Sequence, residues 1–89
     1  MIQVVCNENI EEVLSNPSEY ISHVYDKALI KYYKEDISNP TYILFGIDED
    51  DRYYFTIEDN DVSDDYYLSS NESLLSLFIR LLEKIIKEN

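Results

Sequence analysis

The feature that most constrains the fold is a pair of β-rich segments on either side of an acidic connection. The segments are "TYILFGI" at 41–47 and "RYYFTI" at 52–57. A five-residue connection, 48–52, places large apolar side chains opposite one another, whereas a four-residue connection would mix the two faces. The resulting pairs are Ile47 with Tyr53, Phe45 with Phe55, and Ile43 with Ile57. We therefore predict an antiparallel hairpin with a five-residue tip.

Two short elements precede this hairpin. "IQVVC" at 2–6 is β-branched and short, which is typical of a strand. Ile10, Val13 and Leu14 then follow helical spacing and indicate one or two helical turns before Asn16.

The segment "NPSEYISHVYDKALIKYYKED" at 16–36 predicts a central helix. Asn16 can cap the helix, Pro17 suits its first position, and Glu19 stands where a capping-box acid belongs. Pro40 disfavours helix just before it and marks the boundary. Apolar side chains recur at helical spacing through the segment: Tyr20, Ile21, Val24, Tyr25, Ala28, Leu29 and Tyr32.

The C-terminal part predicts one more strand and a helix. "YYLS" at 66–69 is compatible with a short fourth strand, and Ser69 with Glu72 predicts a capping box for the last helix. That helix is apolar over more than half of its circumference, so it needs cover on two sides. The sheet and the central helix can supply both sides, which we prefer, or a second copy can supply one. The apolar residues are Leu74, Leu75, Leu77, Phe78, Ile79, Leu81, Leu82, Ile85 and Ile86.

Together these elements predict a single α+β domain over residues 1–89. We expect a small antiparallel sheet, made of the N-terminal strand, the central hairpin and a possible fourth strand, with the central and C-terminal helices packed on it. With 89 residues the chain is too short for two separate cores. It shows no signal-peptide pattern and no apolar run long enough for a membrane span, and its single cysteine allows no internal disulfide. We expect a cytoplasmic protein.

Negative charge is concentrated in one stretch, "GIDEDDRYYFTIEDNDVSDDYY" at 46–67. It holds nine acids and one base, Arg52, and so contributes −8 to a net charge of −12. We expect this charge to gather at one end of the molecule. It excludes direct binding to nucleic acid or to an anionic membrane, because phosphates would be repelled, and it favours a basic protein partner.

The sequence offers little for catalysis. It has one cysteine, Cys6, which we expect to be buried, and one histidine, His23, which we expect on the polar face of the central helix, so a nucleophile–base pair is not indicated. There is no glycine-rich phosphate loop and no zinc-ligand spacing. Exposed loop acids lack the cleft that an acid–base pair requires. We expect no enzymatic activity and no cofactor.

A calcium site is also disfavoured. In "DNDVSDDYYLSS", Asp59, Asp61 and Ser63 alternate as the oxygen donors of an EF-hand loop do. Asp64, however, stands at the position of the turn glycine, and Ser70 stands at that of the bidentate glutamate. The pattern predicts no selective metal site and leaves weak cation binding open.

The remaining use for the acidic stretch is protein binding. Carboxylates on a strand and its loops lie several ångströms apart on a rigid support, broadly as phosphates do along a nucleic acid, and tyrosines are favoured in protein interfaces. The alternative is that the acids are a solvated surface and the tyrosines pack within the sheet. The candidate partner-binding residues are Asp48, Glu49, Asp50, Asp51, Tyr54, Glu58, Asp59, Asp61, Asp64, Asp65, Tyr66 and Tyr67.

These features predict an acidic inhibitor that occupies the basic groove of a nucleic-acid-acting enzyme as a mimic of nucleic acid. Small phage-encoded anti-restriction and anti-CRISPR proteins are similar in size and charge. One alternative is an immunity protein that neutralises a toxin nuclease. Another is a homo-oligomeric structural or regulatory module that associates through the last helix, in which case Leu77 or Ile79 would lie in the interface.

The C-terminal half resembles the end of the SUKH-superfamily immunity proteins. The resemblance lies in "TYILFGIDEDDRYYFTIEDNDVSDDYYLSSNESLLSLFIRLLEKI". It consists of an apolar strand, an acidic turn, an aromatic strand, a loop, a "Y-x-L" strand and a terminal apolar helix, in that order. This resemblance implies the neutralisation of a toxin, often a nuclease, and adds no binding residue to the acids named above.

Overall fold

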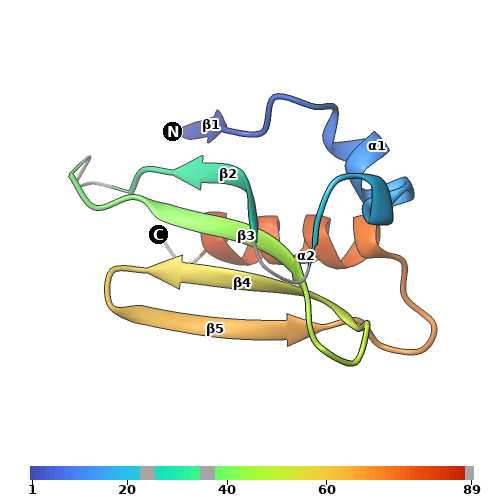
Figure 1. The fold of residues 1–89 in the computed structure, drawn as a ribbon. Coiled ribbons are helices and arrows are strands. Elements are labelled where there is room, and N and C mark those ends of the chain that lie inside the picture. The colour runs from blue at the N-terminus through green and yellow to red at the C-terminus, as the bar shows by residue number, and fades with distance from the viewer. Residues whose placement is uncertain (23–25, 35–37, 88–89) are drawn as a thin grey trace.

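The computed structural model describes residues 1–22, 26–34 and 38–87. Its centre is a five-stranded antiparallel sheet in the order β1-β2-β3-β4-β5, so each strand pairs with its neighbour along the chain (Figure 1). The strands are β1 (Ile2–Val4), β2 (Lys27–Tyr32), β3 (Thr41–Ile47), β4 (Tyr53–Asp59) and β5 (Val62–Tyr67). The helices are α1 (Ile10–Ser15), the 3-10 turn η1 (Pro17–Glu19) and α2 (Leu74–Lys87). In the described part of the chain, no helix is long and apolar enough to cross a membrane.

The predicted hairpin is confirmed in both its extent and its register. β3 pairs with β4 through a tip at 48–52, and the three predicted side-chain pairs lie opposite one another. Phe45 and Phe55 stack with ring centroids 4.9 Å apart, and both are fully buried. The alternation of apolar and polar residues was therefore sufficient to determine the register of this pair.

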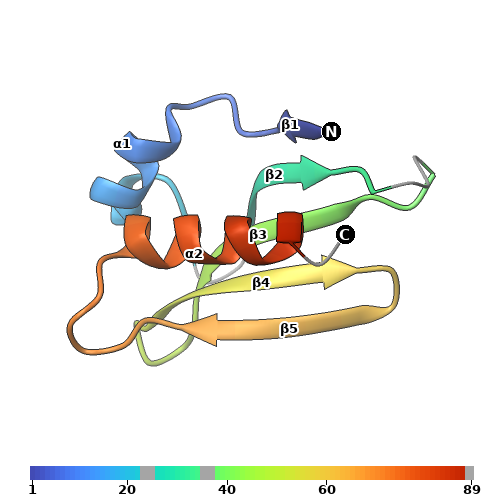
Figure 2. The ribbon, with the colours of Figure 1, turned by 180° about the vertical axis from the view of Figure 1, so that it is seen from behind.

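One face of the sheet carries the core. α2 lies along this face, in front of β3 in the view of Figure 2, and α1 lies at one end of the face. Phe78 of α2 packs against Phe55 with ring centroids 5.9 Å apart, and Val13 of α1 is fully buried in the same cluster. The short predicted helix before Asn16 is thus confirmed as α1, whose first turn is capped by the side chain of Asn9.

The predicted central helix is wrong. In the described part of this segment, the 3-10 turn η1 follows Asn16, whose side chain makes no capping bond, and residues 27–32 form strand β2 between β1 and β3. A β-bulge between Ala28 and Ile30 places Leu29 and Ile30, which are adjacent, both in the core. This bulge breaks the period of two that identifies a strand, so the apolar pattern resembled a helix. The predicted helical positions of His23, Val24 and Tyr25 lie outside the described residues.

Two boundaries near the C-terminus also differ from the prediction. The fourth predicted strand exists as β5, but it begins at Val62 and includes Asp64 and Asp65, which were expected in a loop. The predicted capping box is wrong: α2 begins at Leu74, and Ser73 caps it by accepting a 3.1 Å hydrogen bond from the backbone N–H of Ser76. Ser69 instead donates to Glu72 in the preceding turn, at 3.4 Å.

The wide apolar surface of α2 is only partly covered. Five of its side chains are buried: Leu74, Leu77, Phe78, Leu81 and Ile85. Because residues 27–32 form a strand, no central helix covers the other side, where Ile79 and Ile86 are exposed. Leu77 belongs to the core and is unavailable to any partner, whereas Ile79 is accessible.

Candidate protein-binding site

The twelve candidate residues do not form one acidic end. β4 separates the β3–β4 tip from the turn that joins β4 to β5, and its seven residues span about 20 Å. The two acidic turns therefore lie at opposite ends of the sheet (Figure 1). The residues fall into three groups: the tip, the face of the sheet turned away from α2, and the β4–β5 turn with the helix side of β5.

The tip contains one acid that supports the turn and three that are exposed. Asp48 Oδ1 accepts hydrogen bonds from the backbone N–H groups of Asp50 and Arg52, both at 2.9 Å, and Asp48 Oδ2 forms a 3.1 Å ion pair with Arg52 Nε. The bond from the Arg52 backbone contributes most to lowering the pKa of the Asp48 carboxyl. The side chains of Glu49, Asp50 and Asp51 are exposed. Asp48 thus has a structural role, and its three neighbours form the accessible charge of the tip.

The second group lies on the open face, which we define as the face of β3–β5 turned away from α2. Alternation along the strands places Tyr54, Glu58, Asp65 and Tyr67 on it. The rings of Tyr54 and Tyr67 lie side by side with centroids 5.6 Å apart, and the Arg52 guanidinium carbon lies 4.7 Å from the Tyr67 ring centroid. These contacts hold two tyrosines in fixed positions next to acidic groups.

Tyr54 is further fixed by a residue that the sequence did not identify. Its hydroxyl donates a 2.8 Å hydrogen bond to Asp26, the residue that precedes β2, above Gly46. Burial, followed by this bond and the charge of Asp26, raises the pKa of Tyr54 to about 12. Gly46, the only glycine in the chain, leaves the space in which these two side chains meet. A glycine within a strand was the available signal that another group approaches closely there.

The third group lies around the β4–β5 turn and on the face of β5 that is turned toward α2. Asp59 forms a 2.9 Å ion pair with Lys34, and Asp61 is exposed in the turn. Tyr66 faces α2, where its hydroxyl accepts a 3.1 Å hydrogen bond from Lys84. Tyr66 therefore packs against the core and is separated from the tyrosines of the open face.

Asp65 lies between these groups on the outer strand β5. Its carboxylate accepts a 2.7 Å hydrogen bond from Thr56 on β4, and its side chain is exposed. Asp64, the preceding residue, is also exposed and points to the other face of the strand. β5 thus carries carboxylates on both of its faces, between two acidic turns.

Cys6, the one cysteine in the chain, lies outside these three groups and is buried. Cys6 donates a 3.2 Å hydrogen bond to Glu8, which pairs with Lys27 at 2.9 Å, and burial raises the pKa of the Cys6 thiol. Such a thiol is a weak nucleophile, because the thiolate is the reactive form. Among the residues that the structure describes, no three His, Cys, Asp or Glu side chains are placed to hold a metal ion. His23 lies outside them.

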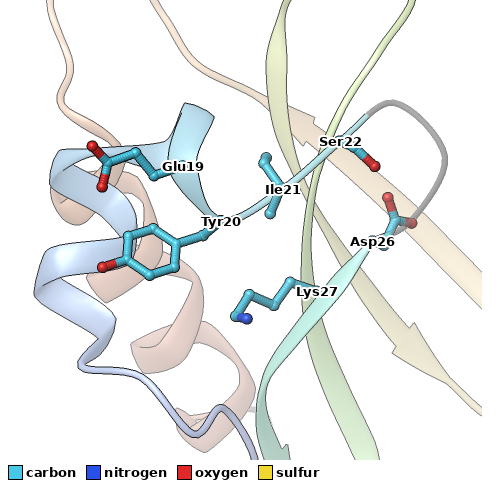
Figure 3. A pocket seen from close by; sticks show the side chains of 6 residues that line it. All are labelled: Glu19, Tyr20, Ile21, Ser22, Asp26 and Lys27. Atoms are coloured by element: carbon cyan, nitrogen blue, oxygen red, sulfur yellow. The ribbon is translucent and has the colours of Figure 1, made fainter.

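A shallow pocket of about 440 Å³ lies between η1 and the beginning of β2 (Figure 3). Two of the charged side chains around it, Asp26 and Lys27, are engaged by Tyr54 and Glu8. The other lining residues are Glu19, Tyr20, Ile21 and Ser22. The pocket thus offers a mixture of polar and aromatic groups, and two of its three charged side chains already have structural partners.

Comparison with known proteins gives no relative: no protein-family model, no curated protein and no solved structure matches this chain.

Proposed function

We propose that this protein is an inhibitor that binds the basic surface of a nucleic-acid-acting enzyme in place of the nucleic acid. The observation that carries this proposal is the row of carboxylates along the β5 edge. The row runs from the tip acids, through Asp65 and Asp64, to Asp61 in the far turn, and it is about as long as β4. An extended row of negative charge is also what a nucleic-acid strand presents to its enzymes.

The arrangement of these carboxylates supports recognition over solubility alone. Solubility requires net charge and no particular geometry. Here the acids of β5 are held on a hydrogen-bonded strand, and those of the tip extend from a turn that Asp48 closes. A rigid row of like charges weakens the fold through repulsion, and a basic groove would relieve that repulsion on binding.

The open face supplies contacts of a second kind. Tyr54 and Tyr67 are immobilised by each other, by Asp26 and by Arg52, so little side-chain entropy remains to be lost when they bind a partner. Tyrosine also combines a large apolar area with a polar tip. In this proposal the acids accelerate the encounter and make it sensitive to salt, while the tyrosines slow dissociation.

The test is affinity capture from host lysate followed by mass spectrometry, with two charge-reversed variants. The first changes Asp50, Asp61 and Asp64 to Lys. The matched control makes the same change at three exposed acids elsewhere: Glu11, Glu12 and Glu83. We expect wild type and control to capture a nucleic-acid enzyme and to inhibit it, and the first variant to lose both properties. Unchanged affinity and salt dependence in the first variant would refute the electrostatic mechanism.

The identity of the captured enzyme separates the two biological settings. A toxin nuclease would make the protein an immunity protein, as the resemblance of residues 41–85 implies. A restriction or CRISPR nuclease would make it an anti-defence protein. Capture of a protein without a basic groove would contradict both.

A further inference from the structure

The two outer strands of the sheet differ in a way that indicates a second interaction surface. β5 carries Asp64 and Asp65 and continues from the acidic turn that contains Asp61. β1 has the sequence "IQV", with no charged side chain. Charged residues on an outer strand prevent pairing with another strand, and an apolar outer strand lacks that protection. We propose that β1, together with the exposed apolar residues of α2, is the interface with a second copy of this chain.

The backbone of β1 has hydrogen-bonding groups available for such pairing. Tyr33 N–H donates to Met1 C=O at 2.9 Å, and Val5 N–H donates to Leu29 C=O at 3.2 Å, so positions 1 and 5 face β2. Backbone groups alternate in direction along an antiparallel strand. The N–H and C=O groups of Ile2 and Val4 therefore point outward, away from β2, where a second β1 can pair with them.

The side chains on this side of the molecule are apolar and exposed. Val4 is 61% exposed and Ile2 is 42% exposed. On α2, Ile79 and Ile86 are 46% and 42% exposed. At 100° per residue they lie on the side of the helix opposite Lys84, which contacts Tyr66 of β5. They therefore lie on the solvent side of α2, on the flank away from β5 and nearer to the β1 edge of the sheet, where Figure 2 shows β1 and α1.

Charge distribution favours a second copy as the occupant. Two chains of net charge −12 repel each other, and the repulsion is least where their acids are farthest apart. Residues 48–67, which hold all the charged groups of that stretch and so −8 of the net charge, lie on the opposite side of β3 from β1. Pairing at β1 therefore keeps the two acidic rows at the outer ends of a continuous ten-stranded sheet. A basic partner, by contrast, would be drawn to the β5 edge.

The interface area and the direction of the β1 backbone groups constrain how the two copies pair. A specific interface buries about 800 Å² on each partner, which three paired residues alone do not supply, so the proposed interface also requires contacts from Ile79 and Ile86. A twofold axis through Gln3 places Ile2 opposite Val4 of the second copy, and this register uses both outward-facing residues. Each copy then presents the same patch, as twofold symmetry requires.

Sedimentation of residues 1–89 at several concentrations tests this interface without any enzyme, so its result is independent of the proposed function. We expect a dimer. Val4→Lys should reduce its association at least tenfold, and Ile79→Glu should also weaken it. The matched control is Val62→Lys on β5, because Val62 is 60% exposed and also lies on an outer strand. A wild-type monomer at every concentration, or equal effects of the two lysine variants, would overturn the proposal.

Cross-linking tests the register and does not depend on how the lysine variants fold. In a Cys6→Ala background, Gln3→Cys should form a disulfide-linked dimer under mild oxidation, because residues on the twofold axis of such a pair are about 4.5 Å apart at Cα. Ser63→Cys on β5 is the control and should remain unlinked. Absence of the Gln3→Cys dimer, or equal linking at both sites, would contradict the proposed register.

Discussion

Tyr54 Oη lies 2.8 Å from Asp26 Oδ1, and this hydrogen bond joins β4 to the residue that precedes β2 across the open face of the sheet. Burial is the first cause, and Asp26 the second, of a Tyr54 pKa of about 12. In the unfolded chain a tyrosine has a pKa near 10. Between these values the unfolded state releases a proton that the folded state keeps, so rising pH favours unfolding.

We therefore predict that the free energy of unfolding falls as pH rises from 10 toward 12, and that Tyr54→Phe reduces this fall. Urea denaturation of both proteins over this pH range measures the difference. Asp26→Asn keeps a hydrogen-bond acceptor but removes the charge, and it should lower the pKa of Tyr54 part of the way. An identical pH dependence in wild type and Tyr54→Phe would show that another group is responsible.

Gly46→Ala should destabilise the fold by about 1–3 kcal/mol, because a methyl group there has no space. Its Cβ would lie 2.7 Å from Tyr54 Oη and would collide with the Asp26 carboxylate. Thermal or urea unfolding measures the loss. In an Asp26→Ala/Tyr54→Ala background both obstacles are absent, and the same substitution should cost much less. If Gly46→Ala reduced stability equally in the two backgrounds, the loss would not come from contacts with Asp26 and Tyr54.

The tip acids should separate into structural and accessible groups. Asp48→Ala removes the acceptor for two backbone N–H groups and should cost about 1 kcal/mol of stability. Asp50→Ala removes one of several exposed like charges and should leave stability unchanged or slightly higher. The urea midpoints of the two variants, measured at low salt, give the comparison. A larger loss for Asp50→Ala would contradict the assigned turn geometry.

Two serines near the beginning of α2 allow the helix cap to be tested by matched substitutions. Ser73→Ala should cost about 1 kcal/mol, because Ser73 Oγ accepts the N–H of Ser76 in the first turn. Ser69→Ala should cost little, since its hydroxyl forms only a long, exposed bond to Glu72. Thermal unfolding followed by circular dichroism distinguishes the two. A larger loss of stability for Ser69→Ala than for Ser73→Ala would support the capping box that was predicted from Ser69 and Glu72.

The sequence pattern was sufficient to predict the structure wherever a segment was compatible with only one secondary structure or register. The register of β3 and β4 followed from the opposition of Phe45 to Phe55, because any shift would have moved apolar side chains into water. The helix at Ile10–Ser15 and the mainly apolar α2 followed from spacing of the same kind. The outward direction of Tyr54 was also predictable, because its neighbours on both sides face the core.

The sequence by itself therefore determined the hairpin, the terminal helix and the amount of negative charge. Tertiary structure decided the rest. Residues 27–32 lack a clean period of two, and they became a strand because β3 has a second edge whose N–H and C=O groups need partners. That choice left Ile79 and Ile86 without a covering helix, and it brought Asp26 to Tyr54. The acids were separated because the extended strand β4, about 20 Å long, lies between the two acidic turns and holds them at opposite ends of the sheet.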